Sequence, residues 1–425
     1  MINIKKNKIG ILGLGYVGLP LFIEFSKHMH VVGFDTNQKR IKDLNNHYDT
    51  NLDITESQLK NISNSIFTNN EDALSNCNIY IITVPTPIDE NDEPNLSPLI
   101  DATKIIANLL KKNDIVIYES TVYPGATEEV CVPLLEKNSR LKFNNDFFVG
   151  YSPERINPGD KSMKLSNIKK VVSGSTKETA NFIQDLYDLI ILEGTFLAKD
   201  IKTAEASKVI ENIQRDVNIA LVNELAVIFN KMNIDTLEVL AAASTKWNFL
   251  PFFPGLVGGH CIGIDPYYLK HKSELLGIYP KIISAAREIN ESMSSYLASQ
   301  VLDNMIKNQL DIRRAKVLVL GLTFKENCPD IRNSKVFSMI NNLKNLSLNV
   351  TAHDPYVDKK EIKEKFDIDI IKSFHKSKWD VIIIAVKHNE YIKMTYKQLS
   401  MMLNKNSLVF DIKGARPIEE GFIRL

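Results

Sequence analysis

The chain has 425 residues, of which 44% are apolar, 24% charged and 8% aromatic. This composition is typical of a folded globular protein of about two or three domains, and it excludes a disordered or fibrous chain. The 52 basic and 51 acidic side chains leave a net charge of +1, so we expect neither nucleic acid nor a membrane surface as a partner. We find no signal segment and no apolar run that could span a bilayer, and we therefore expect a cytoplasmic protein.

Short apolar segments alternate with amphipathic ones over the first half of the chain, a pattern typical of a parallel sheet with helical crossovers. The expected strands are Lys8–Leu12, Val31–Phe34, Ile79–Val84, Ile115–Tyr118, Phe147–Tyr151 and Lys170–Val172. A stretch free of Gly and Pro, from Asp200 to about Met232, then has helical periodicity. It predicts one long connecting helix.

The second half of the chain begins with a segment rich in Gly and Pro, Trp247–Pro266, which predicts a long and commonly functional loop. A helix is expected over roughly Lys281–Asn308. Further strands are expected at Lys316–Leu320, Asn349–His353, Val381–Val386 and Leu408–Asp411. These strands predict a second, smaller α/β layer; the two α/β blocks could be distant copies of one architecture, although their sequences do not show it.

The first expected strand runs into a glycine-rich turn, Gly13-Leu14-Gly15-Tyr16-Val17-Gly18, which is typical of dinucleotide binding. Gly13 allows the tight turn, Gly15 lets the backbone approach a pyrophosphate, and Gly18 lets helix and strand pack closely. Asp35 ends the second strand, where its carboxylate would bind a ribose diol and repel a 2′-phosphate, which favours NAD over NADP. Arg40 leaves an alternative, because it could stack on adenine or neutralise a phosphate. A glycine-rich turn without a ligand is the simpler alternative.

The four cysteines, Cys77, Cys131, Cys261 and Cys328, contain no Cys-x-x-Cys pair, so we expect neither disulfides nor a metal site. Only Cys261 has an unusual setting, between the glycines of Gly258–Gly263 and close to His260 and Asp265. A lone cysteine is usually a small buried hydrophobe. In this loop, however, backbone donors and a local base could serve a thiolate, and both interpretations stay open.

The long helix offers a possible counterpart to this thiol. Lys208, Asn212 and Arg215 are spaced i, i+4, i+7 and would share one face. An expected ion pair between Glu211 and Arg215 favours a solvated Arg215, whereas the apolar neighbours of Lys208 and Asn212 favour burial at a site.

Taken together, these motifs resemble the UDP-glucose/GDP-mannose dehydrogenase family over nearly the whole chain. The matching blocks are Gly13–Pro20, Val84–Pro87, Ser120–Val122, Tyr151–Arg155, Lys208–Asn212, Gly258–Pro266 and Thr323–Lys325. The resemblance implies an α/β protein with two Rossmann-like domains, an NAD-binding domain (1–198) and a nucleotide-sugar-binding domain (313–425). Between them it implies a central helical domain (199–312) with a long helix, the catalytic cysteine loop and the contact of a homodimer.

The resemblance also implies a four-electron oxidation of a sugar C6 alcohol to a carboxylate with NAD. Cys261 would be the covalent nucleophile, which forms a thiohemiacetal and then a thioester. Lys208 and Asn212 would stabilise the oxyanion, and Asp265 would orient or activate water.

Other positions carry over from the family in the same way. Thr121 and Glu154 match positions near the reacting centre, the carboxylate acting through water. The cofactor contacts are expected from Gly13, Gly15, Tyr16, Val17, Gly18, Asp35, Arg40, Thr86, Thr121 and Arg332. The substrate contacts are expected from Glu154, Arg155, Lys208, Asn212, Gly258, Lys325 and Lys413. Lys325 and Arg332 could instead be solvated loop charges, and Lys413 resembles a position from which a partner subunit reaches the nucleotide sugar.

The substrate branch is indicated by the neighbours of the thiol. His260 stands where the glucose branch usually has a small residue, and Phe249–Val257 and Tyr151–Asp160 resemble enzymes of N-acetylated aminosugars. We therefore expect UDP-N-acetylhexosamine (GlcNAc or GalNAc) as substrate, with UDP-glucose or UDP-N-acetylmannosamine as the alternative. Such enzymes commonly serve capsule or O-antigen polysaccharide biosynthesis.

Two other functions compete with this one. A non-catalytic sensor of NAD or nucleotide sugar predicts the loss of Cys261, Lys208 or Asp265, and all three are present. A two-electron dehydrogenase of a small hydroxy acid leaves the block from Lys316 onward unexplained.

Overall fold

The expected strands assemble into two sheets, one in each of two units of the chain. The computed structural model describes residues 7–156, 165–259, 261–414 and 422–425. The first unit is built from the chain up to Glu211 together with Tyr267–Ile278, and the second from Asn212–Pro266 and the chain from Tyr279 onward. Among the described residues, no helix is both long and apolar enough to cross a membrane.

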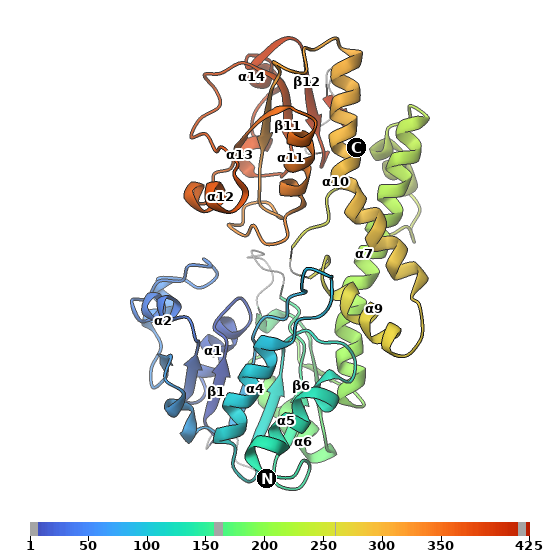
Figure 1. Ribbon diagram of the computed structural model, residues 1–425. Helices are drawn as coiled ribbons and strands as arrows, with labels where there is room; N and C mark the ends of the chain where they lie inside the picture. The colour runs from blue at the N-terminus through green and yellow to red at the C-terminus, as the bar shows by residue number, and fades with distance from the viewer. Residues whose placement is uncertain (1–6, 157–164, 260, 415–421) are drawn as a thin grey trace. The chain divides into compact units, whose positions relative to one another are not determined.

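The described strands of the first unit form an eight-stranded sheet in the order β3-β2-β1-β4-β5-β6-β7-β8 (Figure 1). They are β1 (Ile9–Leu12), β2 (Val31–Phe34), β3 (Ile66–Thr68), β4 (Ile79–Ile82), β5 (Ile115–Tyr118), β6 (Phe148–Tyr151), β7 (Lys170–Gly174) and β8 (Thr195–Leu197). Every residue of β1, β2, β4 and β5 is buried, as expected of parallel strands covered on both faces. The strands β3 and β8 were not predicted, because they are short and each leaves an apolar side chain exposed.

One strand pair departs from the expected parallel arrangement. β7 runs antiparallel to β6, paired through Gly150 with Gly174 and through Tyr151 with Ser173. A parallel neighbour needs a crossover, usually a helix, and the described part of this connection holds only the short 3-10 helix η4 (Leu165–Asn167). The prediction of a parallel sheet is therefore wrong for this pair and confirmed for the other pairs of described strands.

The helices in the first part of the first unit, within residues 18–188, each bury some of their side chains. They are α1 (Gly18–Ser26), α2 (Gln38–Asn45), α3 (Glu56–Lys60), α4 (Ser97–Leu109), α5 (Val132–Ser139) and α6 (Lys177–Asp188), with the 3-10 helix η2 (Glu71–Asn76) and the π-helix η3 (Thr127–Cys131). Local capping sets their starts: the Asn37 side chain accepts from Arg40 N at α2, and the Thr176 hydroxyl from Thr179 N at α6.

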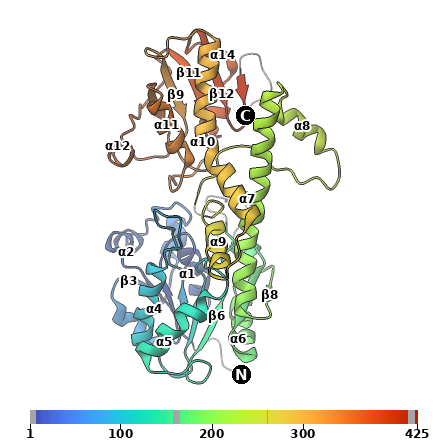
Figure 2. The ribbon, with the colours of Figure 1, turned by 45° about the vertical axis from the view of Figure 1, so that its right-hand side comes forward.

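Long helices connect the two sheets along the chain. The predicted connecting helix is α7 (Ile201–Lys231), and the second predicted helix is α10 (Lys281–Lys307), each within about a residue of its expected bounds. In the second unit α7 and α10 lie side by side (Figure 2). The helices α8 (Thr236–Ala243) and α9 (Asp265–Leu275) flank the loop rich in Gly and Pro.

The described strands of the second unit form a five-stranded parallel sheet in the order β10-β9-β11-β12-β13. They are β9 (Lys316–Leu320), β10 (Asn349–His353), β11 (Trp379–Ile384), β12 (Leu403–Asp411) and β13 (Phe422–Arg424). The helices α11 (Lys335–Asn345), α12 (Lys359–Phe366), α13 (Asn389–Ile392) and α14 (Tyr396–Ser400) accompany them. The second α/β layer predicted from Lys316 onward is thus present.

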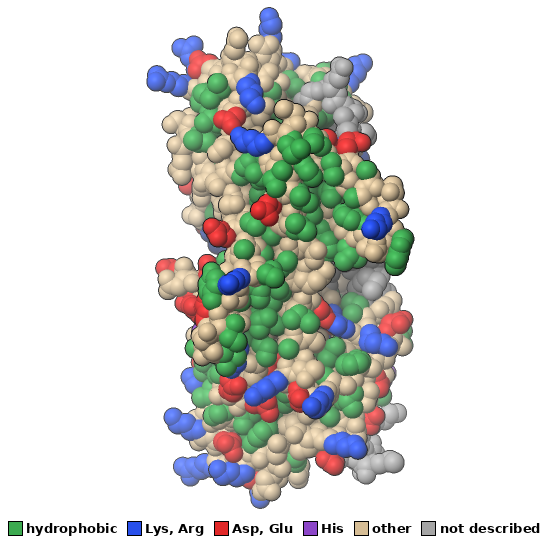
Figure 3. All heavy atoms as spheres, turned by 90° about the vertical axis from the view of Figure 1, so that its right-hand side faces the viewer, with side chains coloured by type: hydrophobic (Ala, Val, Ile, Leu, Met, Phe, Trp, Pro, Cys, Tyr) green, Lys and Arg blue, Asp and Glu red, His purple; other side chains and the backbone are tan. Residues whose placement is uncertain are grey.

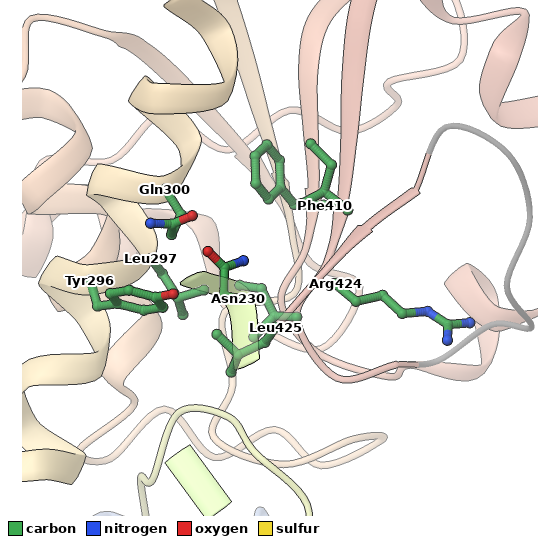
Figure 4. Close-up of a pocket in the computed structure, with 9 residues that line it drawn as sticks. Asn230, Tyr296, Leu297, Gln300, Phe410, Arg424 and Leu425 are labelled. Atoms are coloured by element: carbon green, nitrogen blue, oxygen red, sulfur yellow. The ribbon is translucent and has the colours of Figure 1, made fainter. Parts of the chain in front are cut away.

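A small pocket lies between α10 and the last strands of this sheet (Figure 4). Its lining residues are Asn230, Tyr296, Leu297, Gln300, Phe410, Ile412, Ile423, Arg424 and Leu425. The predicted site residues are all absent from this lining. The pocket is therefore separate from the candidate active site described next.

Candidate active site

The glycine-rich turn after β1 has the backbone geometry that its sequence predicts. Gly13 has a φ of +92°, which favours glycine, and its N–H donates to the carbonyl of Phe34 at 2.8 Å. A Cβ on Gly18 would lie 1.8 Å from the carbonyl oxygen of Gly13, whereas a Cβ on Gly15 would meet nothing within 4 Å. The turn is therefore tightly packed on its inner side and open over Gly15.

Two charged residues surround this turn. The Asp35 carboxylate accepts from Leu14 N at 2.8 Å and from Asn37 N at 2.9 Å. The buried Arg40 donates from Nε to the carbonyl of Leu14 at 2.9 Å and from Nη1 to Asp49 at 2.7 Å. Asp35 thus closes the turn from one side, while the charge of Arg40 is already compensated by Asp49.

Thr121 and Glu154 follow β5 and β6, two neighbouring strands whose carboxyl ends meet at the same edge of the sheet. Glu154 is buried, and its Oε2 accepts from Lys170 Nζ at 3.0 Å. Lys170 also donates to Glu119 at 2.8 Å, and Glu119 accepts from the Tyr187 hydroxyl. Burial raises the pKa of Glu119 to about 7, so this cluster can hold a proton at neutral pH.

The segment after Glu154 is tied to its own carboxylate and to α7. Glu154 Oε1 accepts from the N–H groups of Arg155 and Ile156 at 2.6 and 2.7 Å. Arg155 Nε donates to Glu211 at 2.8 Å. The expected ion pair of Glu211 with Arg215 is therefore wrong, because Glu211 is paired with Arg155 from a different part of the chain.

The polar residues of α7 that are buried follow helical spacing along one face. They are Glu205, Lys208, Asn212, Asp216 and Asn223. The predicted burial of Lys208 and Asn212 is confirmed, whereas Arg215 is exposed. Lys208 is 8% exposed and lies one turn before Asn212 on this face.

Cys261 lies in a turn that leads directly into α9. Its carbonyl oxygen accepts from Ile264 N at 3.2 Å and from Asp265 N at 2.9 Å, and its side chain is partly exposed. The buried Asp265 carboxylate accepts from the Asn212 side-chain amide at 2.5 Å. Asn212 and Asp265 were predicted as site residues from two separate parts of the sequence. The structure brings them into contact next to the turn that carries Cys261. His260 lies outside the described residues.

The two glycines before Cys261 pack closely against the segment between β9 and α11, which belongs to the same unit. A Cβ on Gly258 would lie 2.8 Å from the carbonyl oxygen of Asn333, and one on Gly259 would lie 2.7 Å from the Phe324 ring. Lys413 Nζ donates to the carbonyl of Leu256 at 3.5 Å, and burial lowers the pKa of this ammonium group. Lys413 therefore reaches the loop of its own chain.

Lys325 and Arg332 belong to the long segment between β9 and α11. Lys325 is partly buried, and its carbonyl accepts from the Thr323 hydroxyl at 2.8 Å. The Arg332 guanidinium donates to Asp330, with Nη2 at 2.6 Å from Oδ2. Arg332 is thus oriented by a carboxylate two residues away, while 45% of its side chain stays exposed.

Comparison with known proteins shows that one family matches most of the chain, including all of these residues. The NAD binding domain, the central domain and the UDP binding domain of the UDP-glucose/GDP-mannose dehydrogenase family match residues 7–191, 202–292 and 318–416. The chain belongs to this family. The resemblance seen in the sequence is thereby confirmed, and with it an NAD-dependent dehydrogenase.

Several relatives match this dehydrogenase along its whole length. A UDP-N-acetyl-D-glucosamine 6-dehydrogenase from Salmonella typhi is 51% identical over 425 residues, 100% of both chains. One from Pseudomonas aeruginosa is 51% identical over 421 residues, 99% of this chain and 100% of the relative. The solved structure of a UDP-D-ManNAc dehydrogenase from Pyrococcus horikoshii has a TM-score of 0.90 at 31% identity and covers 98% of each chain.

The glycine-rich turn of this dehydrogenase fits NAD. A Cβ at Gly15 would occupy the open space over the turn, where the exposed amides at the start of α1 suit a pyrophosphate. Asp35 keeps part of its surface exposed, as a ribose-binding carboxylate requires. Tyr16 and Val17 are partly buried beside the turn, and Thr86 is buried after β4.

Several residues around the site were missed by sequence reasoning. Lys170 and Glu119 were missed because each looks like an ordinary residue at a strand end. Asp216 and Asn223 had a usable signal, since they continue the spacing of Lys208 and Asn212 along α7. The described residues contain no group of three or more His, Cys, Asp or Glu arranged to hold a metal ion.

Proposed function

We propose that this dehydrogenase oxidises the C6 alcohol of a UDP-N-acetylhexosamine, GlcNAc or GalNAc, to the uronate with two equivalents of NAD. The observation that carries the proposal is the hydrogen bond of 2.5 Å between Asn212 and Asp265 beside the Cys261 turn. It couples the buried polar face of α7 to the thiol loop. The aminosugar is favoured by the 51% identity to two relatives that are UDP-N-acetyl-D-glucosamine 6-dehydrogenases.

The proposed chemistry assigns a step to each of these side chains. NAD, when bound, would supply the hydride acceptor for each oxidation, and in the first oxidation the proton of the C6 hydroxyl leaves to water. The Cys261 thiolate adds to the C6 aldehyde, which forms a carbon–sulfur bond and moves the negative charge to oxygen. Lys208 and Asn212 stabilise that oxyanion. A second hydride loss turns the adduct into a thioester.

Hydrolysis of the thioester completes the proposed reaction. Water adds to the acyl carbon and the carbon–sulfur bond breaks, which releases the carboxylate and restores the thiol. Asp265, held by Asn212, orients this water. Thr121 and Glu154 lie at the carboxyl ends of β5 and β6, and Glu154 acts through water from its ion pair with Lys170.

The remaining predicted residues bind the two ligands in this proposal. Arg155, Gly258, Lys325 and Lys413 contact the nucleotide sugar, and Arg332 contacts the cofactor. Arg332 has an exposed guanidinium oriented by Asp330, a geometry suited to a phosphate.

A panel of UDP-sugars with NAD tests the substrate and the mechanism together. We expect about two NADH for each UDP-GlcNAc or UDP-GalNAc consumed, with slower turnover of UDP-glucose and UDP-N-acetylmannosamine. One NADH per sugar would contradict the four-electron reaction. Preference for UDP-N-acetylmannosamine would move this dehydrogenase to the branch of the Pyrococcus horikoshii structure.

Replacement of the thiol tests the covalent step. Cys261→Ser should abolish uronate formation, a loss of at least about 10³-fold, while binding of the nucleotide sugar persists. Cys328→Ser is the matched control, since Cys328 is a buried cysteine of the same unit. Four-electron turnover by Cys261→Ser would remove the covalent mechanism.

We further propose that two copies associate through the exposed apolar side of α7. Ile210, Leu221 and Ile228 are 54%, 53% and 46% exposed and follow one helical stripe, and Ile282 on α10 is 70% exposed. Figure 3 shows apolar side chains gathered on the face of the molecule that it presents. An apolar stripe of this kind suits an isologous contact with a second copy. Sedimentation of the wild-type enzyme as a monomer at micromolar concentration would contradict this proposal.

A further inference from the structure

The buried polar face of α7 continues beyond the residues that the proposed chemistry uses. Asp216 is fully buried and binds Arg287 of α10, with Arg287 Nε at 2.8 Å from Asp216 Oδ2 and Nη2 bound to Oδ1. Asn290, one turn after Arg287, donates to Asp216 Oδ1 at 2.7 Å and to its carbonyl at 3.0 Å. These contacts join α7 to α10 through a buried hydrogen-bond network.

The same network holds the chain on both sides of Cys261, at Gly255 and at Gly263, which we take as the two ends of the cysteine loop. At the first end, Asn223 accepts from Gly255 N at 2.8 Å and donates to Gly255 O at 3.1 Å. At the second end, Arg287 Nη1 donates to the carbonyl of Gly263 at 3.3 Å. Asn223 and Arg287 are linked to each other through Asn290 and Asp216, since Asn223 donates to Asn290 at 2.8 Å. Cys261 lies between the two held glycines.

Helix pairing alone does not require these polar groups. Farther along the same two helices, Ala226 of α7 and Leu297 and Val301 of α10 pack in one apolar cluster. A buried ion pair commonly adds little net stability compared with apolar packing of similar volume. A satisfied polar network does, however, fix geometry, because its hydrogen bonds are directional.

A third contact extends the network to the neighbouring helix α11. Glu291 accepts from Arg287 Nη1 at 3.2 Å and from Lys335, the first residue of α11. The residue before that helix, Ser334, packs against the loop, since its Cα would lie 3.4 Å from a Cβ on Gly258. The start of α11 thus lies beside the loop at Gly258, and it is tied to α10 through Lys335 and Glu291.

We propose that Arg287 and Asn223 are positioning residues that set the place of Cys261 by holding Gly263 and Gly255. The proposal rests on the proposed function, in which Cys261 is the nucleophile. Neither residue contacts the reacting atoms in this account. Their role is to keep the thiol loop in register with the part of α7 that carries Asn212.

The variant Arg287→Lys tests this role with little change in charge. A lysine can keep the ion pair with Asp216, but a single ammonium group cannot reproduce the planar fork that also reaches Gly263. We expect kcat to fall by about tenfold or more, because small misplacements of a reacting group cost that much. The KM and the NAD affinity should change by less than about threefold, because the proposed function gives Arg287 no contact with either ligand.

A second readout requires no substrate. Cys261 is partly exposed whereas the other three cysteines are buried, so iodoacetamide alkylation followed by mass spectrometry reports on its thiolate. Because the ionisation of a thiol follows its electrostatic surroundings, displacement of the loop in Arg287→Lys should shift the midpoint pH of alkylation by about half a unit or more. The matched control is Arg314→Lys, because the Arg314 side chain is 90% exposed and pairs only weakly with Asp311, at 3.7 Å.

The outcomes are distinct. A folded Arg287→Lys enzyme with wild-type kcat and wild-type alkylation midpoint would overturn the proposal, as would a loss of kcat that only follows a loss of folded protein. If Arg287→Lys does not fold, Asn223→Ala is measured in the same way at the other end of the loop. Failure of both variants to fold would overturn the proposal, because the network would then serve folding alone. A shifted alkylation midpoint with no oxidation of any UDP-sugar by the wild type would keep the positioning role and reject the proposed function.

Discussion

In each of the two sheets, the first strand along the chain is followed by a turn of the same backbone geometry. The two turns differ in the surroundings of the aspartate that closes them. Gly13 after β1 and Gly321 after β9 have φ values of +92° and +93°. Each N–H donates to the last residue of the neighbouring strand, Phe34 at 2.8 Å and His353 at 2.9 Å. Each turn is then closed by the aspartate that follows that strand.

These aspartates occupy equivalent places but different surroundings. Asp35 accepts from Leu14 N at 2.8 Å, and Asp354 accepts from Leu322 N at 2.6 Å. Asp35 keeps part of its surface exposed, whereas Asp354 is buried and lies 3.1 Å from the buried His388. The first turn therefore keeps a carboxylate available to a ribose, and the second has its carboxylate occupied by the protein.

The two turns also differ in the length of chain that separates each of them from the next helix. α1 begins at Gly18, so the first turn leads at once into a helix N-terminus, but α11 begins only at Lys335. The longer second connection carries Lys325 and Arg332. In the proposed function this one backbone arrangement has two uses: the short glycine-rich turn would offer its amides to the dinucleotide, and the longer loop would offer Lys325 and Arg332 to the ligands.

The largest expected effect is that of Gly18→Ala. Its Cβ would lie 1.8 Å from the Gly13 carbonyl oxygen and 2.4 Å from Thr83 Oγ1, so backbone must move. We expect a loss of at least about 3 kcal/mol in the free energy of unfolding of the first unit, and loss of NAD binding. Calorimetry and NAD titration measure both. The control is Glu326→Ala, at the corresponding position after Gly321; wild-type NAD affinity in Gly18→Ala would break the comparison.

Asp354→Asn should lower stability without changing the affinity for NAD. Asp354 accepts from Leu322 N and Tyr356 N and binds His388, and an amide can replace only part of these bonds. We expect a loss of about 2 kcal/mol in the free energy of unfolding of the second unit, measured by urea denaturation with NAD titration as the control. A weakened NAD affinity would show that the second turn also serves the dinucleotide.

Asp35→Asn should weaken NAD binding with little change in stability, the reverse of the effect expected for Asp354→Asn. The amide can still accept from Leu14 N and Asn37 N through its oxygen, so the thermal midpoint should change little. NAD should bind about tenfold more weakly, because a charge-assisted hydrogen bond to ribose becomes a neutral one. Calorimetric titration with NAD and with NADP checks this. Unchanged NAD affinity would mean that Asp35 only closes its turn, as Asp354 does.

The smallest expected effect is a difference in the pH dependence of the two units. Burial raises the pKa of Glu119 to about 7, so the folded first unit holds a proton that the unfolded chain releases. Its stability contribution is complete below the usual glutamate pKa, about 4.5, and is lost as the pH rises to about 7. Burial alone would raise the pKa of Asp354, but His388 and the amides of Leu322 and Tyr356 hold it below its usual value.

The contribution of Asp354 therefore has the opposite sign. It is complete above the usual aspartate pKa, 3.8, and is lost as the pH falls through the lowered value. Hydrogen exchange of β5 and β9 at pH 5 and pH 7.5 measures the two units separately. We expect β5 to lose protection at the higher pH and β9 to keep it; equal changes in both would contradict the assignment.

The sequence by itself determined those features whose causes are local. Helical periodicity located α7 and α10 to within about a residue, and the apolar runs located most strands. The glycines at 13 and 18 predicted a turn that only they can form without collision. The family resemblance rests on such short blocks, and it is confirmed. The division of the chain at 198 and 312 stays a prediction.

Only the tertiary structure decided which side chains meet. Glu211 was assigned to Arg215, its helical neighbour, and instead binds Arg155, 56 positions away. Lys170 meets Glu119 across 51 positions, and Arg287 meets Asp216 across 71. The direction of β7 was likewise set by its pairing with β6. Local propensity and spacing carry no information about such partners, because these contacts form only when distant elements pack together. The residues that carry the predicted chemistry were therefore recognisable in the sequence, and those that hold them in place were not.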